Sequence, residues 1–264
     1  MGLPPPSAED PMPYAAVNGL EMYHEVHGEG PPLLLLHGGS GSIIEPWILP
    51  FSSSYQVIAV EQMGHGRTAD DPSRPFHYHD MAEDTLGLMD HLGVQRAVVV
   101  GHSDGGIIGL DLAIHHPERV DRLVATGANA RTDGYTAENL GWIHDFDPAE
   151  LPVSAAYARL SPDGPEHWPI FVARLKRMWS EEPDLTDAEL ATIKAPTLLI
   201  VGDADIVTVE HTVDMFRTIP NARLCVVPQA GHGAMPFETV LAFLRTTDPV
   251  SSITGAAGLD QPTA

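Results

Sequence analysis

The sequence has one cysteine, few basic residues and no long apolar run, and each shortage excludes a class of protein. The lone Cys225 excludes an intrachain disulfide and any metal site built from several cysteines. It lies in an apolar run, so we expect a buried, unreactive thiol.

No apolar stretch approaches the roughly 18 residues that a membrane span needs. The first residues also lack the basic and apolar parts of a signal peptide. We therefore expect a cytoplasmic protein that does not enter a membrane.

Basic residues are outnumbered by acidic ones, with 14 Lys and Arg against 36 Asp and Glu and a net charge of −22. This charge repels nucleic acid and anionic membranes, and no cluster of Lys or Arg offers a local exception. The chain has 264 residues, of which 43% are hydrophobic, so it is long enough to bury a substantial core. We expect a small-molecule substrate as its partner, and no oligomeric state follows from the sequence.

Apolar runs that predict strands alternate with periodic segments that predict helices along most of the chain. Residues 14–17 and 20–26 read as a hairpin joined by the turn-forming pair Asn18-Gly19. Further strands are predicted at 32–36, 56–60, 97–100, 123–126, 197–201 and 223–227, and helices at 80–92, 107–116, 209–218 and 237–244. The alternation predicts an α/β fold with a mostly parallel central sheet and helices on both faces.

Residues 128–190 interrupt this rhythm with helical fragments separated by Pro and Gly, and they contain three of the four tryptophans. We interpret them as a helical cap inserted into an α/β core of residues 14–127 and 191–246. The aromatic residues of this segment either line a binding pocket or pack a small core; Trp142 and Trp179 are the better pocket candidates. The ends of the chain, 1–12 and 247–264, have the composition of flexible tails.

The most informative motif is Gly101-His102-Ser103-Asp104-Gly105, which follows a predicted strand and precedes a predicted helix. A serine with glycine two residues before and after it, in a strand-to-helix turn, is typical of a nucleophile elbow. Ser103 would lie at a helix N-terminus, where backbone N–H groups favour a developing oxyanion. Ser103 is therefore the candidate nucleophile. Asp104 could be a second catalytic carboxylate, but we expect it to stabilise the helix dipole instead.

A nucleophilic serine needs a base and an acid that orients the base. His232 directly follows the strand 223–227 and precedes the last helix, so it is the candidate base. The acid should follow the preceding strand, where Asp203 and Asp205 both stand, and spacing does not separate them. For the oxyanion hole, one donor is the N–H of Asp104, and the second should come from the loop His37-Gly38-Gly39.

Taken together, these motifs resemble the α/β-hydrolase superfamily, in its group of cap-bearing serine enzymes, over about residues 14–245. The motifs that carry the resemblance are His37-Gly38-Gly39, Gly64-His65-Gly66-Arg67, Gly101 to Gly105, Gly202-x-x-Asp205 and Gly231-His232, in the family's order of Ser, Asp and His. The resemblance implies Asp205 rather than Asp203 as the acid and Gly39 as the second oxyanion donor. Gly38, in the same loop, is a candidate substrate contact.

The leading hypothesis is a cofactor-free serine hydrolase for a small, mostly apolar ester, lactone or related acyl compound. The family also implies carbon–carbon bond hydrolases, perhydrolases and lyases with similar triads. A second alternative is a ligand receptor that retains the triad without catalysis. We expect no metal, because His77, His79 and Asp80 resemble only a fragment of a metal site and Asp80 fits a helix N-cap.

Overall fold

The central sheet of the computed structural model contains eight strands in the order β1-β2-β4-β3-β5-β6-β7-β8. The structure describes residues 13–246, so the predicted tails 1–12 and 247–264 lie outside the described residues. The strands are β1 (Tyr14–Val17), β2 (Leu20–His27), β3 (Pro32–Leu36), β4 (Gln56–Val60), β5 (Ala97–His102), β6 (Val120–Thr126), β7 (Thr197–Gly202) and β8 (Ala222–Val227). β2 pairs antiparallel with β1 and β4, and every other pair of neighbours is parallel. The predicted, mostly parallel sheet is confirmed.

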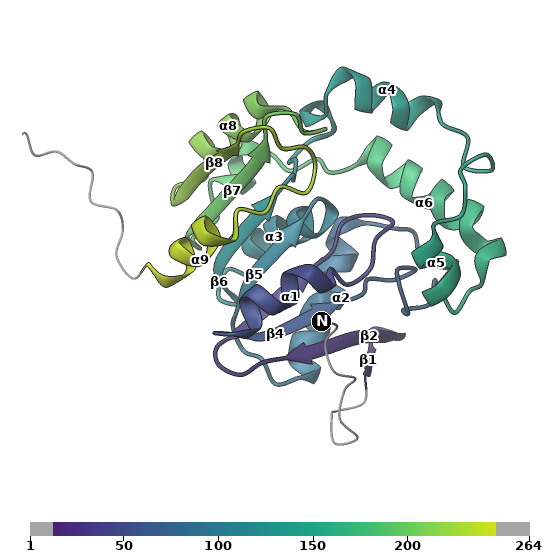
Figure 1. Ribbon diagram of the computed structural model, residues 1–264, viewed down its shortest axis with the longest axis horizontal. Coiled ribbons are helices and arrows are strands. Elements are labelled where there is room, and N and C mark those ends of the chain that lie inside the picture. Colours follow the sequence, from purple (N-terminus) through teal and green to yellow (C-terminus); the bar gives the residue numbers. More distant parts are fainter. Residues whose placement is uncertain (1–12, 247–264) are drawn as a thin grey trace, which may run out of the picture.

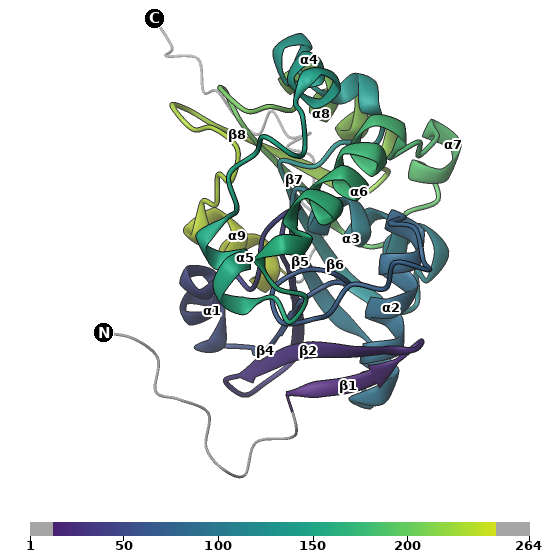
Figure 2. The same cartoon turned by 90° about the vertical axis from the view of Figure 1, so that its right-hand side faces the viewer.

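Helices cover both faces of this sheet, as the sequence predicts. They are α1 (Glu45–Ser52), α2 (Tyr78–His91), α3 (Asp104–His115), α4 (Ala137–Asp145), α5 (Ala155–Leu160), α6 (Trp168–Glu181), α7 (Asp187–Leu190), α8 (Val209–Thr218) and α9 (Phe237–Arg245), with short 3-10 turns at Thr132–Gly134 and Pro165–His167. α1 and α9 lie on one face, and α2 and α3 lie on the other (Figure 2).

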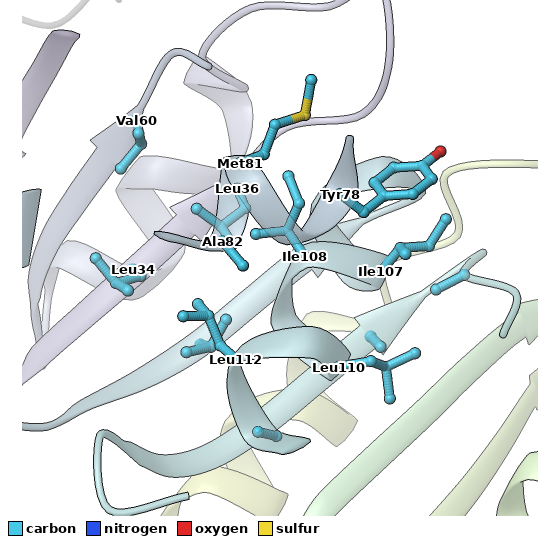
Figure 3. Packing of buried hydrophobic residues seen from close by; sticks show 14 of the residues in the cluster. Leu34, Leu36, Val60, Tyr78, Met81, Ala82, Ile107, Ile108, Leu110 and Leu112 are labelled. Atoms are coloured by element: carbon cyan, nitrogen blue, oxygen red, sulfur yellow. The ribbon is translucent and has the colours of Figure 1, made fainter. Parts of the chain in front are cut away.

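The two hydrophobic cores explain why the central strands are apolar at every position. In β3, Leu34 and Leu36 belong to the core under α2 and α3, whereas Leu33 and Leu35 belong to the core under α1 and α9. Successive side chains of a strand point to opposite faces, so a strand covered on both faces must be apolar throughout. Figure 3 shows the first of these cores, where side chains of α2 and α3 pack over β3 and β4. This packing fixes the first turn of α3, which directly follows the candidate nucleophile.

The helices α1 and α2 differ from the prediction in ways that have a physical reason. The helix α1 was not predicted, because it holds Pro50 in its interior, where proline removes a backbone hydrogen bond and clashes with the preceding turn. α2 begins at Tyr78, and His77 occupies its N-cap position. Asp80 therefore lies in the first turn of the helix and is not the N-cap.

The segment 128–190 leaves the sheet at the carboxyl end of β6 and forms α4 to α7. Three of these helices, α4, α5 and α6, lie together on one side of the sheet, at the upper right of Figure 1. Tyr157, Trp168 and Phe171 are buried and pack against one another, with ring centroids 5.0 to 5.7 Å apart. These aromatic residues thus pack a core. Among residues 13–246, no helix combines the length and apolarity that crossing a membrane would require.

Candidate active site

Ser103 connects β5 to α3 in a backbone conformation that few residues other than glycine adopt. Its φ is 52° and its ψ is −119°, which is a strained position for a residue with a side chain. The flanking glycines allow this sharp turn. A Cβ on Gly101 would lie 2.1 Å from the carbonyl oxygen of Gly105, and one on Gly105 would lie 2.4 Å from that of Leu36. The strand and helix pass each other as the elbow motif predicts.

A chain of two hydrogen bonds links Ser103 to His232 and Asp205. The Oγ of Ser103 lies 2.9 Å from Nε2 of His232, and Nδ1 of His232 lies 2.7 Å from Oδ1 of Asp205. A carboxylate can only accept, so Nδ1 carries the proton and Nε2 is free to accept from the serine hydroxyl. The three side chains come from loops after β5, β8 and β7, whose carboxyl ends meet at one edge of the sheet.

The structure separates the two aspartates that spacing left open. Asp205 contacts His232, whereas Oδ1 of Asp203 accepts the backbone N–H of Ala230 at 3.1 Å. Burial alone raises the pKa of Asp205. The hydrogen bond and charge of His232, together with the N–H groups of Val207 and Gly202, outweigh burial and lower this pKa below its ordinary value. Asp205 is therefore held as a carboxylate beside the imidazole.

The loop after β3 lies directly against the elbow. A Cβ on Gly38 would lie 3.1 Å from Cβ of Ser103, and one on Gly39 would lie 2.4 Å from Oδ2 of Asp104. Within residues 13–246, the backbone N–H groups of Gly39 and Asp104 donate to no protein acceptor. Two backbone donors without a protein partner therefore belong to residues at the elbow, and such free N–H groups are what an oxyanion hole needs.

Asp104 does more than line the first turn of α3. It is only 5% exposed, and burial raises the pKa of its carboxyl. Its Oδ1 accepts the hydroxyl of Tyr78 at 2.9 Å, and its Oδ2 accepts the indole N–H of Trp179 at 3.0 Å. The expectation that this carboxylate serves the helix dipole misses these contacts. It joins α2, α3 and α6 beside Ser103.

Sequence reasoning also missed the contact between His102 and His232. The two imidazole rings lie 4.8 Å apart, and Trp47 packs edge-on against His102 at 5.6 Å. Burial, followed by the charge of His232, lowers the pKa of His102 to about 4. His102 therefore stays neutral at pH 7 and places no second positive charge beside His232. Its position before Ser103 was the only signal in the sequence.

The two tryptophans proposed for substrate binding have different positions. Trp179 lies beside Gly39 and Asp104, whereas Trp142 is 47% exposed on α4 and stacks on Phe146. The structure thus brings Trp179, but not Trp142, to the elbow.

Cys225 is half-buried in β8, and burial raises the pKa of its thiol.

A pocket of about 320 Å³ lies between the loop 72–77 and α6, and none of the site residues above lines it. Its arginines already hold carboxylates, since Arg174 pairs with Asp70 at 2.6 Å and Arg74 pairs with Asp84 at 2.8 Å. This pocket is a separate feature from the elbow.

The fold and the loops around Ser103 define a hydrolase of the α/β class. Residues 31–158 match the family model described as the alpha/beta hydrolase fold. The chain belongs to this α/β-hydrolase family.

The similar proteins are named for different substrates. A protein from Caulobacter sp. strain K31, named "Putative carbamate hydrolase RutD", is 33% identical over 251 residues, which cover 84% of this chain and 92% of the relative. The structure titled "Est816 as an N-Acyl homoserine lactone degrading enzyme" is 29% identical, with a TM-score of 0.63 and coverage of 83% and 93%. A thermophilic esterase from Thermogutta terrifontis is 26% identical, with a TM-score of 0.69 and coverage of 88% and 96%.

Proposed function

We propose that this protein is a serine hydrolase that cleaves a small, mostly apolar acyl compound such as an ester or lactone. The observation that carries the proposal is a relay of two hydrogen bonds. One joins Ser103 Oγ to Nε2 of His232 at 2.9 Å, and the other joins Nδ1 of His232 to Oδ1 of Asp205 at 2.7 Å. This relay supplies nucleophile, base and orienting acid from the chain's own side chains, so the reaction as proposed calls on no cofactor.

In the first half of the reaction, Ser103 Oγ attacks the carbonyl carbon while its proton passes to Nε2 of His232. The N–H groups of Gly39 and Asp104 would hold the negative oxygen of the tetrahedral intermediate. The intermediate then breaks the bond to the leaving group, which takes the proton back from His232. Water attacks the acyl-enzyme in the same way, and this step releases the acid and restores the serine hydroxyl.

Two features support a neutral, compact substrate. The net charge of −22 repels anions, and the carboxylate of Asp104 lies one residue from the nucleophile. The aromatic ring of Trp179, one of the predicted substrate contacts, reaches the elbow from α6, so the segment 128–190 would act as the cap that shapes the acyl pocket. Gly38 would line the same pocket through its backbone.

A cytoplasmic location stays a prediction from the sequence.

A second candidate substrate class is the carbamates. The name of the relative that is 33% identical over 84% of this chain favours it. A carbamate carbonyl can be attacked by the same serine, which would expel the alcohol and leave a carbamoyl-enzyme; water would then release a carbamic acid, which breaks down to an amine and carbon dioxide. Carbon–carbon bond hydrolysis, perhydrolysis, a lyase reaction and ligand reception are alternatives that the following experiment also addresses.

The test compares the full chain with Ser103→Ala, using the surface variant Ser53→Ala as a control. Aryl esters of graded acyl chain length and the matching aryl carbamates are assayed for multiple turnovers. A fluorophosphonate probe is followed by mass spectrometry of the intact protein. We expect ester turnover by the wild type and by Ser53→Ala, with one probe added at Ser103, and neither turnover nor labelling in Ser103→Ala.

The pattern of outcomes separates the alternatives. Faster turnover of carbamates than of matched esters would move the substrate class to carbamates. Labelling at Ser103 without turnover of either series would favour a carbon–carbon bond hydrolase, a perhydrolase or a lyase. No labelling, with ligand-induced thermal shifts intact, would favour a receptor. Full turnover by Ser103→Ala would overturn the mechanism.

A further inference from the structure

Three potential metal ligands converge on the surface where α2 packs against α3. They are His79 in the first turn of α2 and Asp111 and His115 on α3, and their ligand atoms all lie within 4.8 Å of one another. Nδ1 of His79 lies 3.0 Å from Oδ1 of Asp111, and Nε2 of His115 lies 3.7 Å from Oδ2. The two imidazoles therefore approach the two oxygens of one carboxylate.

The carboxylate at the centre of this cluster is buried and has no fixed cation. The side chain of Asp111 is 6% exposed, and within residues 13–246 it forms no ion pair with Lys or Arg. A buried carboxylate needs a positive partner. The two imidazoles are 53% and 40% exposed, so an ion can reach them from solvent. The cluster thus has a buried anionic base and an open side.

The spacing suits a small transition-metal ion. Ligands at about 2.0–2.2 Å in a tetrahedron lie roughly 3.4 Å from one another. The separations of 3.0 and 3.7 Å, which run to the two different oxygens of Asp111, lie on either side of that value, and all three ligand atoms lie within 4.8 Å of one another. Asp111 and His115 are four residues apart on one helix, so both face the same side one turn apart. Two imidazoles and one carboxylate, with water in the fourth position, form a ligand set that zinc accepts.

The charges around the cluster also favour a cation. The negative charges of Asp80 and Glu83 interact with His79, and the charge of Glu83 also interacts with Asp111. Both Asp111 and His115 lie in the last turns of α3, at the negative end of its dipole. His77, which the sequence placed beside His79 in a possible metal fragment, points away and pairs with Glu182. The ligands are therefore a different set from the one that spacing suggested.

We propose that His79, Asp111 and His115 form a binding site for one divalent transition-metal ion, best suited to Zn²⁺, that clamps α2 to α3. The site is separate from the reacting atoms. Asp111, the α3 ligand nearer the elbow, follows Asp104 by seven residues of the helix, which is about 10 Å at 1.5 Å per residue. Bound metal therefore stabilises the helix pair without contacting Ser103.

The experiment uses the full chain without an affinity tag, stripped with a chelator. Zn²⁺ binding is measured by calorimetry, Co²⁺ coordination by its visible absorption, and stability by thermal unfolding. The variants are His79→Ala, His115→Ala and Asp111→Asn, and His91→Ala is the control because it removes another exposed histidine of α2. Circular dichroism of each metal-free variant checks that it folds.

We expect one metal ion per wild-type chain, the spectrum of four-coordinate Co²⁺, and a rise in the melting temperature with Zn²⁺. At a free metal concentration 100 times the dissociation constant, the folding equilibrium shifts about 100-fold toward the folded state. Each ligand variant should bind at least about 100-fold more weakly, since even partners outside the ligand set change affinity by 10–100-fold. The His91 variant should match the wild type. Absence of saturable binding, or equal binding by all variants, would overturn the proposal.

Discussion

The indole N–H of Trp179 donates to Oδ2 of Asp104 at 3.0 Å, across 75 residues of sequence. This bond connects α6, in the segment 128–190, to the residue that follows Ser103. The same carboxylate accepts from Tyr78, and no Lys or Arg among residues 13–246 forms an ion pair with it. The buried acid beside Ser103 therefore accepts from two neutral donors, and one of them, Trp179, ties α6 to the elbow.

Trp179→Phe tests this dependence. The substitution keeps an aromatic side chain, though a smaller one, and removes one donor to a buried carboxylate, so we expect a loss of about 1–3 kcal/mol in the free energy of unfolding. We also expect KM to rise more than kcat falls, because the change loosens the pocket more than the relay. Urea unfolding and steady-state kinetics measure both. Trp142→Phe, on the exposed face of α4, is the control and should stay within about 0.5 kcal/mol of the wild type. Equal effects of the two variants would contradict the role of the bond.

Gly39→Ala probes the proposed oxyanion hole. The new Cβ would lie 2.4 Å from Oδ2 of Asp104 and 2.5 Å from Cζ2 of Trp179, so the loop must move its N–H group. We expect kcat to fall about 100-fold, the cost of losing one oxyanion donor, with a smaller change in KM. Gly141→Ala in α4 is the matched control, because its Cβ meets no atom within 4 Å. It should keep full activity and gain up to about 1 kcal/mol in stability. Wild-type kcat in Gly39→Ala would remove Gly39 from the mechanism.

The sequence predicted the sheet and the meeting of the three relay loops, because both follow from local patterns. Apolar runs of four to six residues indicate strands buried on both faces, and parallel strands bring their carboxyl ends to one edge. Ser103 and His232 are the only relay candidates in their loops, so their approach follows directly. Asp203 and Asp205 both follow β7, and only the course of the backbone decides which one faces the imidazole.

Contacts between distant helices could not be predicted in this way. Nothing in the local pattern of Asp104 shows that Tyr78 and Trp179 will donate to it, since those residues come from two other helices. The spacing of apolar residues indicates that a helix has a buried side, but the packing angle between helices decides which polar groups meet there. The cluster at His79 has the same origin, because its other two members lie on α3.

Asp205→Asn and Asp203→Asn form a matched pair that tests the choice of acid. An amide at position 205 can donate to Nδ1 of His232, which would place the proton on the wrong nitrogen. We expect kcat to fall roughly 10⁴-fold with little change in KM, as in other Ser-His-Asp enzymes. An amide at position 203 keeps the oxygen that accepts from Ala230, so activity should stay within about threefold. A larger loss in Asp203→Asn than in Asp205→Asn would reverse the assignment.

The buried imidazole of His65 predicts a dependence of stability on pH. Burial, together with the charge of His37, lowers its pKa from 6.5 to about 3. The unfolded chain therefore binds a proton between these values that the folded chain does not bind. The resulting stability is complete above pH 6.5 and is lost as the pH falls toward 3.

His65→Phe isolates this contribution, since the ring already packs against Phe76 and Phe171 at centroid distances of 6.0 and 4.9 Å. The variant loses the hydrogen bond to the carbonyl of Met63, which changes stability by an amount that does not depend on pH. The measurement is the free energy of urea unfolding of both proteins at pH 7.5, 6.5 and 5.5. The wild type should lose about 1.4 kcal/mol relative to the variant by pH 5.5, because one pKa unit corresponds to that energy. A difference that stays constant across the series would show that His65 titrates normally in the folded protein.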